Sequence, residues 1–183
     1  MSGSRKLWVA AVVVVAGVLG AVGMKAYAFG GADNMLQPGA SAPDFTLPSQ
    51  TDTQVSLKDY RGKYVVLYFY PKDMSSGCTV EAHNFERDTA KYAAANAVVL
   101  GVSLDSVESH KTFCTKDGLN FKLLADPDHK VTDAYGVSVM MGHFPARDTF
   151  LISPEGKVVK TWQVKDVNKH SDDVLAAIAE MKK

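Results

Sequence analysis

Two runs of the sequence are almost continuously apolar, which is typical of strands buried in the middle of a sheet. The first covers 64–70 and is β-branched and aromatic, and the second covers 97–103. Pro71 and the Ser75-Ser76-Gly77 sequence end the first strand, because proline lacks a backbone donor and these residue types favour turns. The pattern therefore predicts two central strands, the first of which runs into a turn.

Segments of good helix formers, bounded by capping residues, follow these strands. The first begins at Cys78 and continues over 79–95, which contains neither Pro nor Gly. The others are a helix capped by Ser106 and closed by Gly118, a helix with Asp126 as N-cap and Pro127 in its first position that ends at Gly136, and an amphipathic helix over 170–183 that Ser171 could cap.

Shorter extended segments complete the pattern. They cover 45–48, 54–57 and 121–124, together with 149–152 and 158–162, which a turn over 153–157 joins as a β-hairpin. Strands that alternate with helices and end in a hairpin and a helix are typical of an α/β domain. The order therefore predicts a central mixed sheet flanked by helices.

The first 28 residues have the pattern of a targeting segment rather than of a folded domain. Arg5 and Lys6 precede an unbroken apolar run over 7–24, and Ala26-Tyr27-Ala28 offers a small-x-small cleavage site. This order fits a cleaved signal peptide, but the run is also long enough for a retained membrane anchor. In either case we expect export, to the periplasm or to the periplasmic face of the inner membrane.

Length and charge narrow the remaining possibilities. Residues 39–183 are enough for one domain with its own core, and 29–38 are predicted to link it to the N-terminal segment. Twenty basic and twenty acidic residues leave no net charge, so nothing indicates a nucleic-acid partner. The five histidines and two cysteines form no cluster with the spacing of metal ligands, so we expect neither a metal nor another cofactor.

Cys78 stands where the predicted turn enters the predicted helix. The unpaired N–H groups and the positive dipole end at a helix start favour a thiolate over a thiol. Because the thiolate is the nucleophilic form of cysteine, this placement makes Cys78 a candidate reactive thiol.

The residues around Cys78 resemble a known signature. Pro71-x-x-x-Ser75-x-x-Cys78 is similar to the peroxiredoxin motif Pro-x-x-x-Thr/Ser-x-x-Cys, and the wording from Tyr70 to Ala82 is close to the bacterioferritin-comigratory-protein (PrxQ) branch. The resemblance extends from Gly39 to the last predicted helix. It implies a thioredoxin-like fold, a hydroperoxide substrate, a thioredoxin-like reductant and, as is frequent in this branch, a monomer.

The resemblance also implies roles for individual residues. Cys78 would attack a hydroperoxide and become a sulfenic acid. Arg147, in a matching Arg-x-Thr-Phe context, would stabilise the thiolate and the peroxide, and Ser75 would hydrogen-bond to them in place of the more usual threonine. Pro71 would shape the pocket and shield the sulfur. Glu81 matches the signature too, but stabilisation of the helix dipole explains it at least as well as a catalytic part.

The second cysteine departs from the commonest pattern of this branch. Many members carry a resolving cysteine five residues after the first, where this chain has His83, whereas Cys114 lies 36 residues beyond Cys78. Some members place it there, which implies that Cys114 attacks the Cys78 sulfenic acid to form an intramolecular disulfide. Such a bridge needs Cα atoms about 4.4–6.8 Å apart, so we expect local unwinding around both cysteines. A buried, inert Cys114 in a one-cysteine peroxidase is the alternative.

A thiol-dependent peroxidase is the leading hypothesis, and two other function classes stay open. One is an exported thiol–disulfide oxidoreductase, although the residues before Cys78 lack the Cys-x-x-Cys pair that this activity normally needs. The other is a binding module in which Cys78 and Cys114 form a permanent structural disulfide, which an exported location would allow.

Overall fold

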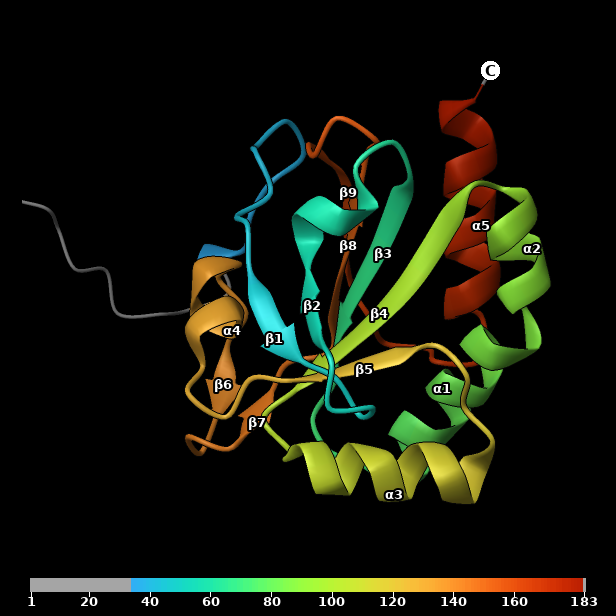
Figure 1. The fold of residues 1–183 in the computed structure, drawn as a ribbon. Helices are drawn as coiled ribbons and strands as arrows, with labels where there is room; N and C mark the ends of the chain where they lie inside the picture. The colour runs from blue at the N-terminus through green and yellow to red at the C-terminus, as the bar shows by residue number, and fades with distance from the viewer. Residues whose placement is uncertain (1–33, 183) are drawn as a thin grey trace, which may run out of the picture.

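A central sheet of five strands organises the chain (Figure 1). The computed structural model describes residues 34–182, so the predicted targeting segment over 1–28 lies outside the described residues. Three strands, β3 (Tyr64–Phe69), β4 (Ala97–Ser103) and β5 (Lys122–Ala125), run parallel to one another, whereas β8 (Asp148–Ile152) is antiparallel to both β3 and β9 (Val158–Gln163). The strand order is β5, β4, β3, β8 and β9. This arrangement confirms the predicted α/β class with a mixed sheet.

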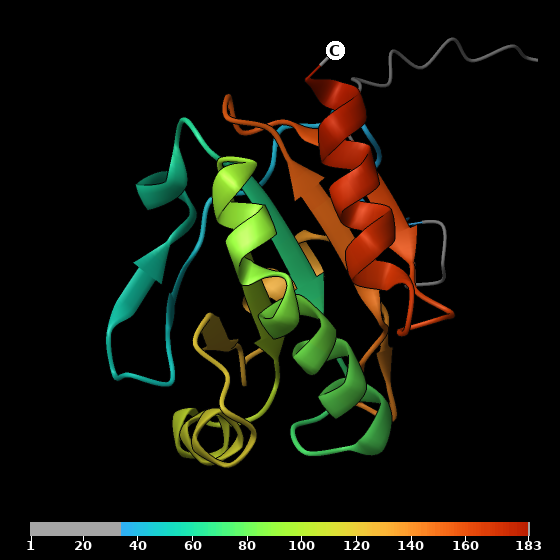
Figure 2. The same cartoon turned by 90° about the vertical axis from the view of Figure 1, so that its right-hand side faces the viewer.

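Helices and short strands cover both faces of the sheet. One face packs against α1 (Ser76–Arg87), α2 (Thr89–Ala94) and α5 (His170–Met181), which stand in front of the strands in Figure 2. The other face packs against β1 (Thr46–Pro48), β2 (Gln54–Ser56), η2 (Leu57–Tyr60) and α4 (Lys130–Ala134). α3 (Val107–Asp117) lies below the sheet in Figure 1, and β6 (Val139–Met140) pairs with β7 (Phe144–Pro145) just before β8.

The alternation of side chains along β3 connects these two layers. Val66 and Tyr68 belong to the core under α1 and α5, whereas Val65, Leu67 and Phe69 belong to the core on the opposite face. Successive residues of a strand point to opposite faces, so an apolar residue at every position produces a core on each side. Within 34–182, no helix is both long enough and apolar enough to cross a membrane.

The predicted strands and the last helix are confirmed, but the long helix over 78–95 is divided in two. α1 ends at Arg87, and Asp88 separates it from α2. The buried Asp88 carboxylate accepts hydrogen bonds from Arg87 and from Ser171 of α5. The long-range bond from Ser171 fixes the chain at a position where the helix would otherwise continue.

The predicted helix ends are confirmed for α3 and wrong for two other helices. Ser106 caps α3 by accepting a hydrogen bond from the Ser109 N–H (3.2 Å), and Gly118 closes it in the left-handed region. Asp126 is not the N-cap of α4, which begins at Lys130, because a turn intervenes and the carboxylate reaches forward to the Thr132 N–H (2.8 Å). Ser171 does not cap α5 either, since its hydroxyl donates to Asp88 (2.8 Å).

Gly101 in β4 lets the ring of Tyr68 lie against the sheet. Gly101 pairs with Tyr68 on one side and with Leu123 on the other. A Cβ atom at this position would lie 2.8 Å from the Tyr68 ring and 2.7 Å from Leu123 Cδ2. The fully buried Tyr68 ring also packs on Phe85 of α1, with ring centroids 4.8 Å apart. Because Gly101 has no side chain, the Tyr68 ring can pack between β4 and α1.

We predict that Gly101→Ala lowers the free energy of unfolding by about 1–3 kcal/mol, because an added methyl group overpacks a closed core. Chemical denaturation monitored by circular dichroism measures the change. Gly77→Ala is the control, since a Cβ there would meet only Arg147 Nη2, at 3.4 Å, and alanine favours the helix. Equal stability of the two variants would contradict the prediction.

Candidate active site

The topology brings three loops together at one edge of the sheet. β3 and β4 are parallel, so the segments that leave them start at the same edge. β8 is antiparallel to β3, and the pairing of Tyr68 with Thr149 places the start of β8 beside the end of β3. Arg147 immediately precedes β8. It therefore lies next to the turn that leads from β3 into α1.

This turn sets the position of Cys78. The Tyr70 N–H still bonds to the Val102 carbonyl (3.1 Å), and the chain then leaves the sheet at Pro71. Met74 adopts a left-handed conformation (φ 57°) and Ser75 an extended one, so that α1 begins at Ser76. Cys78 thus lies in the first turn of α1, as predicted, where backbone N–H groups have no partners within the helix.

The Cys78 sulfur is buried and contacts a guanidinium. Cys78 is 1% exposed, and Arg147 Nη2 donates a hydrogen bond to its Sγ atom (3.3 Å). Arg147 Nη1 forms an ion pair with Glu81 Oε2 one turn further along α1. The structure therefore places Arg147 beside Cys78, where the resemblance implied that it would lie, although the two residues are 69 positions apart.

Glu81 is a member of this site, which the sequence did not establish. Its side chain is buried, and its Oε1 atom has no hydrogen-bond partner in the described structure. Burial raises the pKa of Glu81 to about 7, and the nearby Arg147 only partly offsets that effect. Burial lowers the pKa of Arg147, but the charges of Glu81 and Cys78 more than compensate, so this pKa lies above its ordinary value. The guanidinium stays charged beside the sulfur.

The other two residues of the signature lie in the same turn. The Ser75 hydroxyl donates to the Lys72 carbonyl (3.0 Å) and has no hydrogen bond to Cys78 within the described residues. Its oxygen lone pairs are therefore available to accept a hydrogen bond from a bound molecule. Pro71 is partly buried at the end of β3. His83 is exposed and pairs with Asp117 of α3 (3.2 Å).

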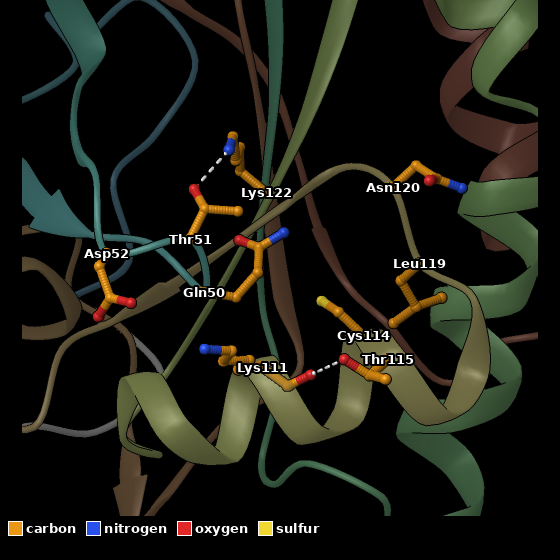
Figure 3. Close-up of a pocket in the computed structure, with 9 residues that line it drawn as sticks. All are labelled: Gln50, Thr51, Asp52, Lys111, Cys114, Thr115, Leu119, Asn120 and Lys122. Atoms are coloured by element: carbon orange, nitrogen blue, oxygen red, sulfur yellow. Dashed lines mark hydrogen bonds between the residues drawn. The ribbon is translucent and has the colours of Figure 1, made fainter.

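Cys114 occupies a different environment on α3. It is 8% exposed and lines a pocket of about 460 Å³ whose walls include Gln50, Leu119 and Lys122 (Figure 3). Burial raises the pKa of Cys114 to about 11, and the carboxylates of Asp73 and Glu86 add to this effect. Cys78 and Cys114 are both free thiols, although both belong to the same apolar core. In this conformation, Cys114 is a protonated thiol at neutral pH.

We predict that Arg147→Gln slows the oxidation of Cys78 by hydrogen peroxide about 100-fold or more, because it removes a charged donor aimed at the sulfur. Stopped-flow measurement of the second-order rate constant tests this. Arg61→Gln, which changes an exposed arginine, should react like wild type. The double variant Arg147→Gln/Glu81→Gln avoids an uncompensated buried carboxylate and should be equally slow. A rate within a few-fold of wild type would contradict the prediction.

Glu81→Gln should change the pH dependence of this oxidation. As the pH rises through about 7, Glu81 ionises and its charge opposes the effect of Arg147 on the sulfur, whereas Gln keeps an acceptor without the charge. The rate ratio of variant to wild type should stay near one below pH ~6 and rise to about 2–10 above pH ~8. Glu86→Gln, a partly exposed site on the same helix, should give a flat ratio. A rate ratio for Glu81→Gln that does not change with pH would contradict the inferred effect of Glu81 ionisation on the reaction of Cys78.

Comparisons with known proteins agree with this geometry. The model of the AhpC/TSA family matches residues 38–161. Peroxiredoxin Bcp of Bacillus subtilis is 41% identical over 152 residues, which are 80% of this chain and 97% of that protein. The structure of peroxiredoxin Q from Xanthomonas campestris is similar with 40% identity and a TM-score of 0.73, covering 82% of this chain and 99% of that chain.

Peroxidoxin BcpB of Mycobacterium tuberculosis is similar in structure as well, with 30% identity and a TM-score of 0.76 over 81% of this chain and 99% of that chain. These relatives confirm the expected thioredoxin-like fold. A buried thiol at a helix start, paired with an arginine, is thus found in a chain whose relatives over most of its length are peroxiredoxins. The chain belongs to the AhpC/TSA family and, within it, to the Bcp/PrxQ peroxiredoxins, which are thiol-dependent peroxidases.

Proposed function

We propose that Cys78 is the peroxidatic nucleophile, that Cys114 resolves it, and that a thioredoxin-like protein restores both thiols. The observation that supports the first role most strongly is the 3.3 Å hydrogen bond from Arg147 Nη2 to the Cys78 sulfur. A guanidinium and the positive dipole end of α1 thus both lie next to this sulfur. Among the described residues Cys114 is the only other cysteine, and its high pKa makes it unreactive where it lies.

In the first step, the Cys78 thiolate attacks the proximal oxygen of a hydroperoxide. A sulfur–oxygen bond forms, the O–O bond breaks, and the leaving oxygen takes a proton to become water or an alcohol. Two electrons pass from sulfur to the peroxide, and Cys78 becomes a sulfenic acid. Ser75, whose proton is directed at Lys72, would accept the hydrogen bond of the peroxide O–H and orient it. Pro71 would restrict access of water and of further peroxide to the sulfur.

Arg147 and the backbone would stabilise the charge that moves in this step. Negative charge passes from the sulfur to the leaving oxygen, so donors near both atoms lower the barrier. Arg147 Nη2 already points at the sulfur, and the N–H groups at the start of α1 have no helical acceptors. Because organic and inorganic peroxides share the O–O bond, we propose that both are substrates. Alkyl peroxide reduction is attributed to the bacterioferritin comigratory protein of Xanthomonas campestris.

In the second step, the Cys114 sulfur attacks the sulfenic acid of Cys78. An intramolecular disulfide forms and water leaves. Burial keeps the Cys114 pKa near 11, so the movement that brings it to Cys78 would also expose and activate it. The positions of two cysteines in peroxiredoxin Q of Xanthomonas campestris support this pairing. That protein has been solved with either of them replaced by serine, and they are separated by the same number of positions as Cys78 and Cys114.

In the third step, a dithiol of a thioredoxin-like protein reduces the disulfide to two thiols and is itself oxidised to a disulfide. The apolar N-terminal segment suggests where this happens. We propose that the chain is exported, by a cleaved signal or a retained anchor, and that it works in the periplasm as a monomer. Its reductant would then be a thioredoxin-fold protein on that side of the membrane.

We predict that Cys78→Ser abolishes the reaction with peroxide and that Cys114→Ser leaves the first oxidation at the wild-type rate. The Cys114→Ser variant should accumulate Cys78 sulfenic acid, because no internal thiol can resolve it, and should lose most turnover with a thioredoxin reducing system. Stopped-flow peroxide consumption and mass spectrometry of alkylated protein measure both effects. Full turnover by Cys114→Ser would favour a one-cysteine enzyme, and loss of the first step only in Cys114→Ser would reverse the roles.

A further inference from the structure

A buried polar cluster connects the two segments that carry the cysteines. We name it the Asp73 cluster, and its members are Tyr70, Asp73, Ser109 and His110. Asp73 Oδ1 accepts a hydrogen bond from the Tyr70 hydroxyl (2.6 Å), and Asp73 Oδ2 accepts one from the Ser109 hydroxyl (2.7 Å). His110 Nδ1 lies 2.8 Å from the same Oδ2 atom. The side chains of Asp73 and His110 are 1% and 0% exposed.

The cluster joins the turn before α1 to the first turn of α3. Tyr70 and Asp73 belong to the turn that leads to Cys78, whereas Ser109 and His110 are the third and fourth residues of α3. His110 lies one helical turn before Cys114, and residues with this spacing share a helix face. A movement of α3 as a rigid unit that delivers Cys114 would therefore separate His110 from Asp73.

Breaking this contact is costly because Asp73 and His110 are buried and the Asp73 carboxylate would lose hydrogen bonds. Burial raises the pKa of Asp73, but the hydrogen bonds from His110, Tyr70 and Ser109 outweigh it, so the pKa lies below its ordinary value. Asp73 is thus a carboxylate whose bonds depend on α3 staying in place. His110 Nε2 has no hydrogen-bond partner in the described structure. This unpaired atom makes the closed arrangement less stable than a fully bonded cluster would be.

We propose that Asp73 and His110 are positioning residues that hold α3 against the turn before Cys78 and thereby set the rate of disulfide formation. This inference rests on the proposed role of Cys114 as the resolving cysteine. While the cluster is intact, Cys114 stays in its pocket beside Gln50 (Figure 3), and Cys78 is free to react with peroxide. When it opens, the start of α3 is released and Cys114 can reach the sulfenic acid. The cluster thus separates oxidation of Cys78 from its resolution.

The test measures the oxidation of Cys78 and the formation of the Cys78–Cys114 disulfide separately, in the full chain. Reduced protein is mixed with hydrogen peroxide, quenched with an alkylating reagent after set times, and analysed by mass spectrometry for sulfenic acid, disulfide and sulfinic acid. Asp73→Asn and His110→Phe should form the disulfide about 3- to 30-fold faster than wild type, because each removes a coupled buried interaction. Their first oxidation should be unchanged, and they should yield less sulfinic acid at high peroxide.

His110→Asn offers a rescue, because its amide nitrogen can take the place of Nδ1 and should return the rate close to that of wild type. A second pair of less disruptive variants keeps the test decisive if Asp73→Asn or His110→Phe does not fold. Ser109→Ala removes one donor to Asp73, whereas Thr112→Ala removes a hydroxyl from the exposed side of α3, where it bonds only to Glu108. Ser109→Ala should speed disulfide formation relative to Thr112→Ala.

The outcomes distinguish this inference from the proposed function. If wild type forms the Cys78–Cys114 disulfide but Asp73→Asn, His110→Phe and Ser109→Ala form it no faster, the inference is overturned and the function stands. If disulfide formation in these variants becomes slower, the inference is overturned as well. A wild-type chain that never forms this disulfide would overturn both.

Discussion

The guanidinium of Arg147 is the group on which the site depends, because it contacts both buried acidic groups at the start of α1. It donates to the Cys78 sulfur at 3.3 Å and pairs with Glu81. A buried sulfur and a buried carboxylate could not both be negative so close together without a compensating positive charge. Arg147 therefore places a positive charge between the Cys78 sulfur and the Glu81 carboxyl group inside an apolar core, and burial raises the pKa of Glu81 to about 7.

The pairing of strands in the central sheet places the Arg147 guanidinium beside Cys78. Cys78 and Arg147 are far apart in the sequence, but antiparallel pairing of β3 with β8 sets the end of one strand beside the start of the other. The two cysteines then experience opposite surroundings within one core. Cys78 faces a cation and a helix start, whereas Cys114 faces apolar surroundings and nearby carboxylates that keep it protonated. This difference supports the proposal that Cys78 reacts first and that Cys114 reacts only after it has moved.

The strands and the place of Cys78 could be predicted because they depend on local pattern. The apolar runs, the turn at Pro71 and the caps Ser106 and Gly118 are each encoded by neighbouring residues. The interruption at Asp88 could not be predicted this way, since it follows from a bond to Ser171 that only the packed α5 supplies. The position of α4 was mispredicted because the Asp126 carboxylate reaches past a turn rather than capping at once.

Local sequence pattern was equally limited in predicting the candidate active site. Cys78, Ser75, Pro71 and Arg147 are candidates through the resemblance to a family motif, whereas composition and periodicity alone would have marked only Cys78. The sequence left the role of Glu81 open and did not indicate the Asp73 cluster, because acidic residues near a helix start normally face water. Their burial is a property of the assembled fold. An acidic residue one helical turn after a candidate reactive cysteine, as Glu81 is after Cys78, is therefore a signal to look for a buried basic partner.

The glycine at position 101 has an implication for how this protein can change over evolutionary time. Its missing side chain is the space that the ring of Tyr68 fills, so the two positions cannot accept larger residues independently. A homologue with a bulkier residue in place of Gly101 should carry a smaller one in place of Tyr68. Covariation between positions 68 and 101 would then show that these two residues share the space between the sheet and α1.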